Sequence, residues 1–152
     1  MISSVADKVI SNLNGAIDWG DLNFRIYWDG DLCEEILNSP GTAKSPKIDK
    51  VGTGRIFLGI GNMNNDSKNN PCLSADILGD WREEIVIRSG QDMVIFTTNW
   101  PSDYSIYTLW HDHQYRQGMV WQTIGYNQPV HTSFFLGEME GITMAPPPLM
   151  TT

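Results

Sequence analysis

A nine-residue acidic pattern occurs twice in the chain and constrains its fold more than any other feature. The two copies are Asp29-Gly30-Asp31-Leu32-Cys33-Glu34-Glu35-Ile36-Leu37 and Leu78-Gly79-Asp80-Trp81-Arg82-Glu83-Glu84-Ile85-Val86. Both read x-Gly-Asp-x-x-Glu-Glu-Ile-aliphatic, and the second copy starts 49 residues after the first. A unit of roughly 40–50 residues with several short strands is the size of one β-propeller blade. The repeat therefore predicts consecutive blades of such a fold.

Short runs of β-branched and aromatic residues support an all-β prediction. Such residues favour pleated strands, and the Gly-, Asn- and Asp-rich segments between them are typical of turns. Strands are expected at 24–28, 55–60, 105–110, 118–124 and 134–136, and a hairpin at 84–88 and 93–97. The polar segment 37–54 is expected to be a connection, and no helix-length amphipathic segment competes with the all-β interpretation.

The chain divides into three parts on this interpretation. Residues 1–20 form an N-terminal connecting segment, residues 21–140 hold the blades, and residues 141–152 form a Pro-rich tail that is not expected to pack. At roughly 45 residues a blade, the central part has room for about three blades. Cys33 and Cys72 are expected as unpaired thiols in the core, because Cys is among the most buried residue types.

The charge and hydropathy of the chain argue against two classes of partner. Its formal net charge is −8, with 10 Lys and Arg residues against 18 Asp and Glu residues. Nucleic acids and anionic membranes bind clusters of Lys and Arg, so neither partner is expected. No run of about 18 apolar residues predicts a membrane span, and no signal-peptide pattern opens the chain.

The second copy of the repeat also suggests a metal site. It resembles the Asp-x-Asp-Gly-Asp-Gly-x-x-Glu loops of calcium-binding propellers, in which alternate carboxylates surround a hard cation. Leu78 stands where that pattern has its second Asp, and Trp81 where it has its second Gly. The candidate ligands that remain are Asp76, Asp80 and Glu84. The loop either binds calcium or is degenerate, held by hydrogen bonds and by pairing of Arg82. The lost carboxylate favours the second interpretation, because Ca²⁺ usually takes about 6–8 oxygen ligands.

Several long motifs follow one another in the order seen in one enzyme family. They cover residues 24–32, 66–88, 95–98, 107–112, 114–116, 121–122, 125–129 and 134–138. Over roughly residues 22–140 the chain resembles the rhamnogalacturonan lyases of polysaccharide lyase family eleven. The resemblance implies an eight-bladed, calcium-binding β-propeller, extracellular or periplasmic, that cleaves the rhamnogalacturonan-I backbone of pectin by β-elimination. A chain with about three blades would hold only the C-terminal part of that fold.

β-Elimination at a galacturonate needs a base for the C5 proton, and the leaving group benefits from an acid. The resemblance makes Lys68 the candidate base and Tyr126 the candidate acid or substrate contact. By the same resemblance, the candidate substrate contacts are Asn65, Ser67 and Asn127. Asp66 departs from the family's substrate loop and adds a negative charge near a polyanionic substrate.

Three functions remain open from the sequence. The first is part of a pectin lyase, inactive alone, whose exposed blade faces need the remaining propeller blades or self-association to cover them. The second is a non-catalytic carbohydrate-binding module that kept the blade scaffold. The third is a truncated reading frame without a function of its own.

Overall fold

The computed structural model describes residues 24–39, 43–125, 127–134 and 136–137, together with two short strands near the N-terminus. These are β1 (Ile2–Ser3) and β2 (Lys8–Val9), which pair antiparallel. Beyond these two strands, the expected N-terminal segment 1–20 and tail 141–152 lie outside the described residues, as does the side chain of Ser67. Within the described part, no helix has the length and apolar content needed to cross a membrane.

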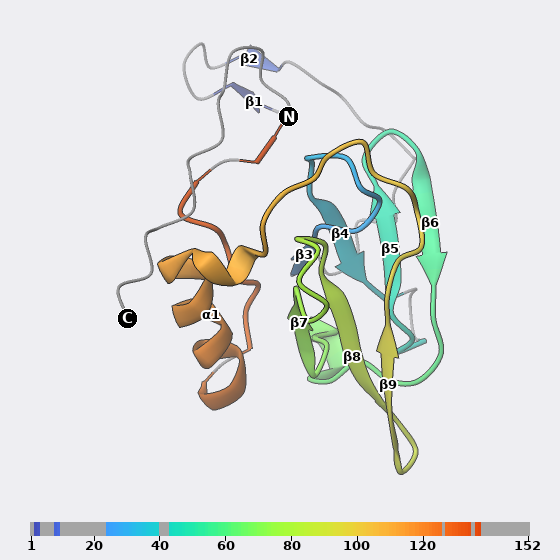
Figure 1. The fold of residues 1–152 in the computed structure, drawn as a ribbon. Helices are drawn as coiled ribbons and strands as arrows, with labels where there is room; N and C mark the ends of the chain where they lie inside the picture. Colours follow the sequence, from blue (N-terminus) through green and yellow to red (C-terminus); the bar gives the residue numbers. More distant parts are fainter. Residues whose placement is uncertain are drawn as a thin grey trace, which may run out of the picture.

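Two antiparallel sheets form most of the described structure. The first consists of β3 (Phe24–Ile26), β4 (Glu35–Asn38), β5 (Lys47–Lys50) and β6 (Gly54–Leu58). The second consists of β7 (Leu73–Ala75), β8 (Glu84–Ser89) and β9 (Asp92–Phe96). In both sheets the strands follow one another in sequence order, and Figure 1 shows the two sheets side by side. The expectation of a mainly β fold is therefore confirmed.

The two copies of the acidic pattern occupy the same place in the two sheets. Each copy forms the loop between the first two strands and ends on the second one. Ile26 of β3 pairs with Glu35 of β4, and Ala75 of β7 pairs with Glu84 of β8. Both pairs keep the offset of 49 residues, so the sequence repeat is also a structural repeat.

Most strand predictions are confirmed, but one connection was predicted wrongly. β3, β6, β8 and β9 lie at the expected segments, and Ser89 pairs with Asp92 across the tight turn of the β8–β9 hairpin. The segment 37–54, expected to be a polar connection, contains β5 and the end of β4. The buried side chains of Lys47 and Asp49 form an ion pair of 2.7 Å, which lets a charged sequence enter the sheet.

The strand expected at 118–124 was also predicted wrongly. Residues 113–124 form helix α1 (His113–Ile124), where a strand was expected at 118–124. Asp112 caps its N-terminus by accepting a hydrogen bond from the Tyr115 amide at 3.0 Å. Tyr115 and Met119, one helical turn apart, are buried. Capping and burial therefore outweigh the β preference of residues such as Val120.

The strands expected at 105–110 and 134–136 are absent from the described residues. Leu109–His111 forms a 3₁₀ turn, η2, because the Thr108 side chain caps it. The described positions of 134–136 have no strand assignment. Cys33 and Cys72 form no disulfide, as expected, but both are exposed, so their expected burial was wrong. Each lies beside a strand, in a loop.

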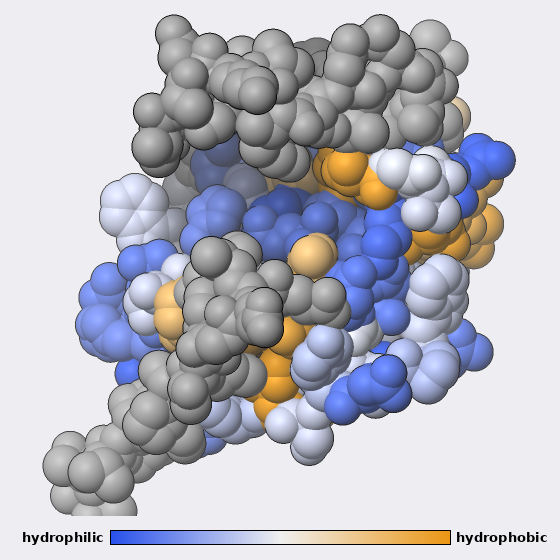
Figure 2. Space-filling model, turned by 90° about the horizontal axis from the view of Figure 1, so that it is seen from above, coloured by the Kyte–Doolittle hydropathy of each residue, from blue (hydrophilic) through white to orange (hydrophobic). Residues whose placement is uncertain are grey.

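Two hydrophobic clusters hold the two sheets and α1 together. The first cluster packs the two sheets together, with Ile26 and Ile48 from one sheet and Ile85 and Ile87 from the other. The second packs the loop side of the second sheet against α1, which lies beside β7 in Figure 1. Seen from the end of the molecule in Figure 2, hydrophilic side chains occupy the middle of the described surface.

Candidate functional site

The acidic loop after β7 is a hydrogen-bonded turn whose three candidate metal ligands point to different partners. Asp76 is fully buried, and its Oδ2 accepts hydrogen bonds from Thr108 Oγ1 at 2.6 Å and from the Leu109 amide at 2.8 Å. Its Oδ1 is buried without a hydrogen-bond partner. Asp76 therefore anchors the segment that leads into α1.

Glu84 and Asp80 are also engaged in protein contacts. Glu84 Oε2 accepts from the amides of Ile77 at 2.8 Å and Leu78 at 3.1 Å. Burial raises the pKa of Glu84, while these hydrogen bonds act in the opposite direction. Asp80 pairs with Arg82, the pairing expected of a degenerate loop.

Trp81 keeps the loop geometry although it replaces a glycine of the calcium-loop pattern. Its φ of 69° lies in the left-handed region that glycine adopts without strain. The indole is buried and meets the Tyr27 ring edge-on, with centroids 6.0 Å apart. Packing of the indole therefore offsets the backbone strain.

The three predicted ligands do not form a common cation cage in this arrangement. Among the described residues, the carboxylates that do lie close together are those of Asp29, Asp31 and Glu35, with oxygens within 4.8 Å of one another. This group lies in the first copy of the repeat.

The loop that carries Lys68 has an unusual backbone. It forms a short 3₁₀ turn, Asp66–Lys68, flanked by Asn65 and Asn69. The φ angles of Asn65, Asp66 and Asn69 are 62°, 42° and 50°, all in the left-handed region. Asn and Asp adopt this region more readily than other non-glycine residues, so the composition of the loop suits its backbone.

Hydrogen bonds at the base of this loop impose its conformation. Asn64 and Asn70 pair in both directions, at 2.6 Å and 3.0 Å, and the Lys68 amide donates to the Asn65 carbonyl at 2.9 Å. Lys44 pairs with Asp66 and lowers the pKa of its carboxyl, so the extra charge of Asp66 has a counterion.

The structure joins the Lys68 loop to the segment around Asn127. Asn70 Nδ2 donates to the Asn127 carbonyl at 2.8 Å, and Asn127 Nδ2 donates to the Pro71 carbonyl at 2.7 Å. The predicted contacts Asn65 and Asn127 therefore belong to one linked surface region. Tyr126 lies outside the described residues.

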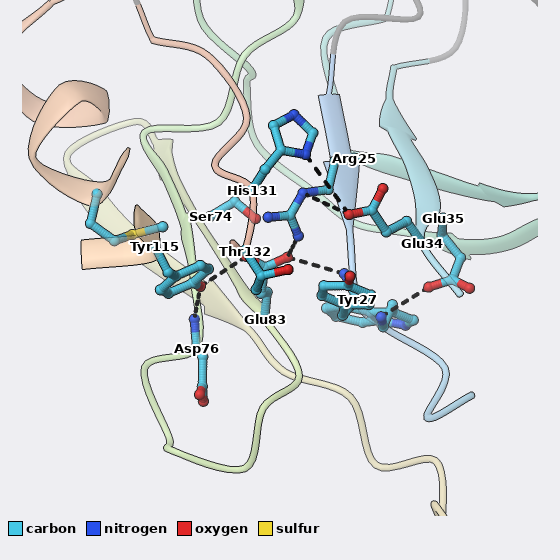
Figure 3. Close-up of polar contacts among 12 residues, drawn as sticks. Arg25, Tyr27, Glu34, Glu35, Ser74, Asp76, Glu83, Tyr115, His131 and Thr132 are labelled. Carbon is cyan, nitrogen blue, oxygen red and sulfur yellow. Dashed lines mark hydrogen bonds and ion pairs between the residues drawn. The ribbon is translucent and has the colours of Figure 1, made fainter. Parts of the chain in front are cut away.

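A buried network that the sequence analysis missed ties the two repeats to α1 (Figure 3). Arg25 of β3 pairs with Glu83 at 2.5 Å, and Glu83 also accepts from the Tyr115 hydroxyl at 2.8 Å. The Tyr115 hydroxyl in turn accepts from the Asp76 amide at 2.9 Å. Burial raises the pKa of Glu83, although Arg25 opposes the shift. The sequence signal that could have indicated this network was the Glu-Glu pair of the repeat. In the second copy, the first glutamate of that pair, Glu83, contacts Arg25.

A cavity of about 550 Å³ opens beside this network. Tyr27, Glu34, His131 and Phe134 are among its lining residues, and Figure 3 shows His131 near Glu34. Its aromatic and polar side chains are of the kinds that contact sugars, through stacking and hydrogen bonds. Lys68 does not line it.

The chain matches the family model for the C-terminal domain of rhamnogalacturonan lyase family 11 over residues 3–148. It is 46% identical over 132 residues to the rhamnogalacturonan endolyase YesW of Bacillus subtilis, covering 86% of this chain and 21% of YesW. It is 43% identical over 138 residues to the exolyase YesX of the same organism, covering 84% of this chain and 22% of YesX.

Solved structures give the same result. The crystal structure of YesX superposes with a TM-score of 0.75 at 40% identity, over 91% of this chain and 24% of that chain. A rhamnogalacturonan lyase from Bacillus licheniformis superposes with a TM-score of 0.73 at 43% identity, over 86% and 22%. The chain thus spans about a fifth of the length of the curated relatives it matches.

Proposed function

The chain belongs to rhamnogalacturonan lyase family 11, and we propose that it is the C-terminal part of a lyase that cleaves the rhamnogalacturonan-I backbone of pectin by β-elimination. The proposal includes a polysaccharide partner and an extracellular or periplasmic place of action. The two sheets would be consecutive blades of a propeller that further blades complete.

The observation that carries this proposal is the linkage of the Lys68 loop to the Asn127 segment. Three left-handed residues fix the loop, and hydrogen bonds of Asn70 and Asn127 hold the two segments together. Binding residues commonly lie on loops that a rigid scaffold holds in place, as these hydrogen bonds hold this one. In the proposed role, Lys68 takes the C5 proton and Asn65 and Asn127 orient the sugar, with Ser67 and Tyr126 as further contacts.

The three candidate calcium ligands are each engaged by other protein groups in this structure. Asp76, Asp80 and Glu84 have protein partners on separate sides, so they do not fit a shared cation without rearrangement. Lys68 acts, in this proposal, through the geometry of its own loop.

Binding to oligosaccharides of rhamnogalacturonan-I tests the proposal. Calorimetry on the wild type, Lys68→Ala and Asn127→Ala should show weaker binding for both variants. Arg55→Ala is the control, because Arg55 is an exposed cation on β6 outside the loop. Equal loss of binding in the control would indicate non-specific attraction of the polyanion and would contradict the assignment.

A second candidate function is carbohydrate binding without catalysis. The cavity beside Tyr27 and His131 favours it, because this cavity offers sugar-binding side chains away from Lys68. In that case His131→Ala would weaken oligosaccharide binding and Lys68→Ala would leave it unchanged. The same calorimetric series therefore separates the two functions.

A further inference from the structure

The first acidic loop contains a group of three carboxylates in the first sheet. Carboxylate oxygens of Asp29, Asp31 and Glu35 lie within 4.8 Å of one another. Asp29 and Glu35 are buried, and Asp31 is half-buried. Three negative charges this close repel one another strongly unless a cation lies between them.

Lys50, the last residue of β5, supplies that cation. Its Nζ, at the end of β5, donates to both Asp29 and Asp31. The same Nζ lies 4.0 Å from Glu35 Oε1. The ammonium group therefore faces all three carboxylates, in the position that a hard metal ion takes in an acidic loop of this type.

Glu35 gives an independent sign that the centre of this group requires positive charge. Its Oε2 accepts from the Trp28 amide at 2.9 Å, but Oε1 is buried without any hydrogen-bond partner. The side chain is only 1% exposed. The unpartnered oxygen faces Lys50.

The second copy of the repeat pairs its acidic loop with a basic side chain from a different position. Asp49 lies opposite Ile36 in the first sheet, and Phe96 lies opposite Ile85 in the second. Thr97 therefore stands at the position of Lys50, so that copy has no equivalent lysine, and Thr97 Oγ1 donates to Glu84 Oε1 at 3.2 Å instead. Its Asp80 pairs with Arg82, which replaces Cys33 of the first copy. Each loop thus has one basic side chain of its own, taken from a different position in the sequence.

We propose that Lys50 is a tethered cation that closes a latent divalent-metal site formed by Asp29, Asp31 and Glu35. The wild-type loop needs no metal ion, because the ammonium group already neutralises the carboxylates. Loss of the Lys50 charge opens the site to an oxygen-seeking ion such as Ca²⁺. A surface cavity lined by Asp29, Asp31 and Lys50 gives ions access to it.

Terbium luminescence tests this proposal, because Tb³⁺ replaces Ca²⁺ in oxygen sites and is excited through nearby aromatic rings. Trp100 and Tyr104 line the same cavity as the carboxylates. Lys50→Met, which keeps the length of the side chain and removes its charge, should give at least tenfold more sensitised emission than the wild type. The double variant Lys50→Met with Asp29→Asn should lose this gain, which assigns the signal to the first loop.

The melting temperature provides a second readout on the same proteins. Lys50→Met should melt below the wild type without metal, and Ca²⁺ should raise its melting temperature more than that of the wild type. A wild type that binds Tb³⁺ as strongly as Lys50→Met, with the signal lost in Asp29→Asn, would overturn the proposal.

A measurement on the wild type covers the case in which Lys50→Met does not fold. The ammonium resonance of Lys50, assigned by comparison with Lys50→Arg, is followed by NMR during a Ca²⁺ titration to about 10 mM, above the affinity range of weak calcium sites. The account predicts an unchanged resonance. Displacement of the resonance by Ca²⁺ would show that the ion, not the lysine, belongs in the loop.

Discussion

Glu35 and Glu84, 49 residues apart in the sequence, make the same hydrogen bond in two copies of one structural unit. Oε2 of Glu35 accepts from the Trp28 amide at 2.9 Å, and Oε2 of Glu84 accepts from the Ile77 amide at 2.8 Å. In each case the donor lies seven residues before the glutamate. The last acidic residue of the repeat therefore fastens the loop back onto the end of the preceding strand.

Replacement of Glu84 tests this structural role. Glu84→Ala leaves the amides of Ile77 and Leu78 without their acceptor, and should lower the free energy of unfolding by about 2 kcal/mol or more. Glu84→Gln retains an acceptor oxygen and should cost less. Urea unfolding at equilibrium measures both values, and equal losses would show that the hydrogen bonds do not stabilise the loop.

Stability should fall as the pH rises through the neutral range. Burial is the largest cause of the raised pKa values of Glu35, Glu83 and Glu84. A raised pKa means that the folded state holds its proton more tightly than the unfolded state. The contribution of each such proton to the free energy of unfolding is fully present below the ordinary pKa of 4.5. For Glu35, this contribution is lost as the pH rises through about 8.

Urea unfolding at several pH values between about 5 and 8 measures this dependence. Glu35→Gln removes one of the titrating groups, so its stability should vary less with pH over the same interval. A wild type that becomes more stable from pH 5 to pH 8 would contradict the direction of these shifts.

Gly118 gives a test of how α1 packs. An alanine in the middle of a helix is usually more stable than glycine by about 1 kcal/mol. Here a Cβ at Gly118 would lie 2.5 Å from Val130 Cγ1, so Gly118→Ala should instead destabilise the chain by about 1–3 kcal/mol. Thermal unfolding of Gly118→Ala, with and without Val130→Ala, checks this. The second change should restore part of the loss, and a stabilising Gly118→Ala would contradict the packing.

The outer face of α1 should drive self-association of the isolated chain. Val120, Trp121 and Ile124 are 53%, 71% and 77% exposed, and they lie one helical turn apart or less on one face of α1. Analytical ultracentrifugation should show concentration-dependent association that weakens in the double variant Trp121→Gln, Ile124→Gln. Thr123→Ala, which changes an exposed α1 residue away from the centre of this face, is the control. Association that is the same in all three proteins would exclude this face.

The sequence predicted the repeat and its strands because local patterns carry that information. It missed β5, since the Lys47–Asp49 pair that makes a charged strand acceptable in a sheet is visible only in three dimensions. It missed α1, because the side chains that favour strands in this segment lie partly on the exposed face of the helix. The cap at Asp112 was the local signal that could have indicated the helix.

The candidate site was predicted in part. The Lys68 loop stood out through its resemblance to a known substrate loop, but its left-handed backbone and its link to Asn127 could not be foreseen. Asn70 and Asn127 are 57 residues apart in sequence, and no local pattern encodes their contact. The Arg25–Glu83 pair is equally remote, with its partners 58 residues apart in sequence.

The central claim is that this chain supplies the Lys68 loop of a family 11 lyase active site. A chimera in which the chain replaces the matching fifth of YesW tests it, with the unsaturated uronate product followed by ultraviolet absorbance. The account predicts turnover of rhamnogalacturonan-I by the chimera and a loss of about 10²-fold or more in Lys68→Ala, the size expected for a lost general base. A Lys68→Ala chimera that keeps the full rate would contradict it.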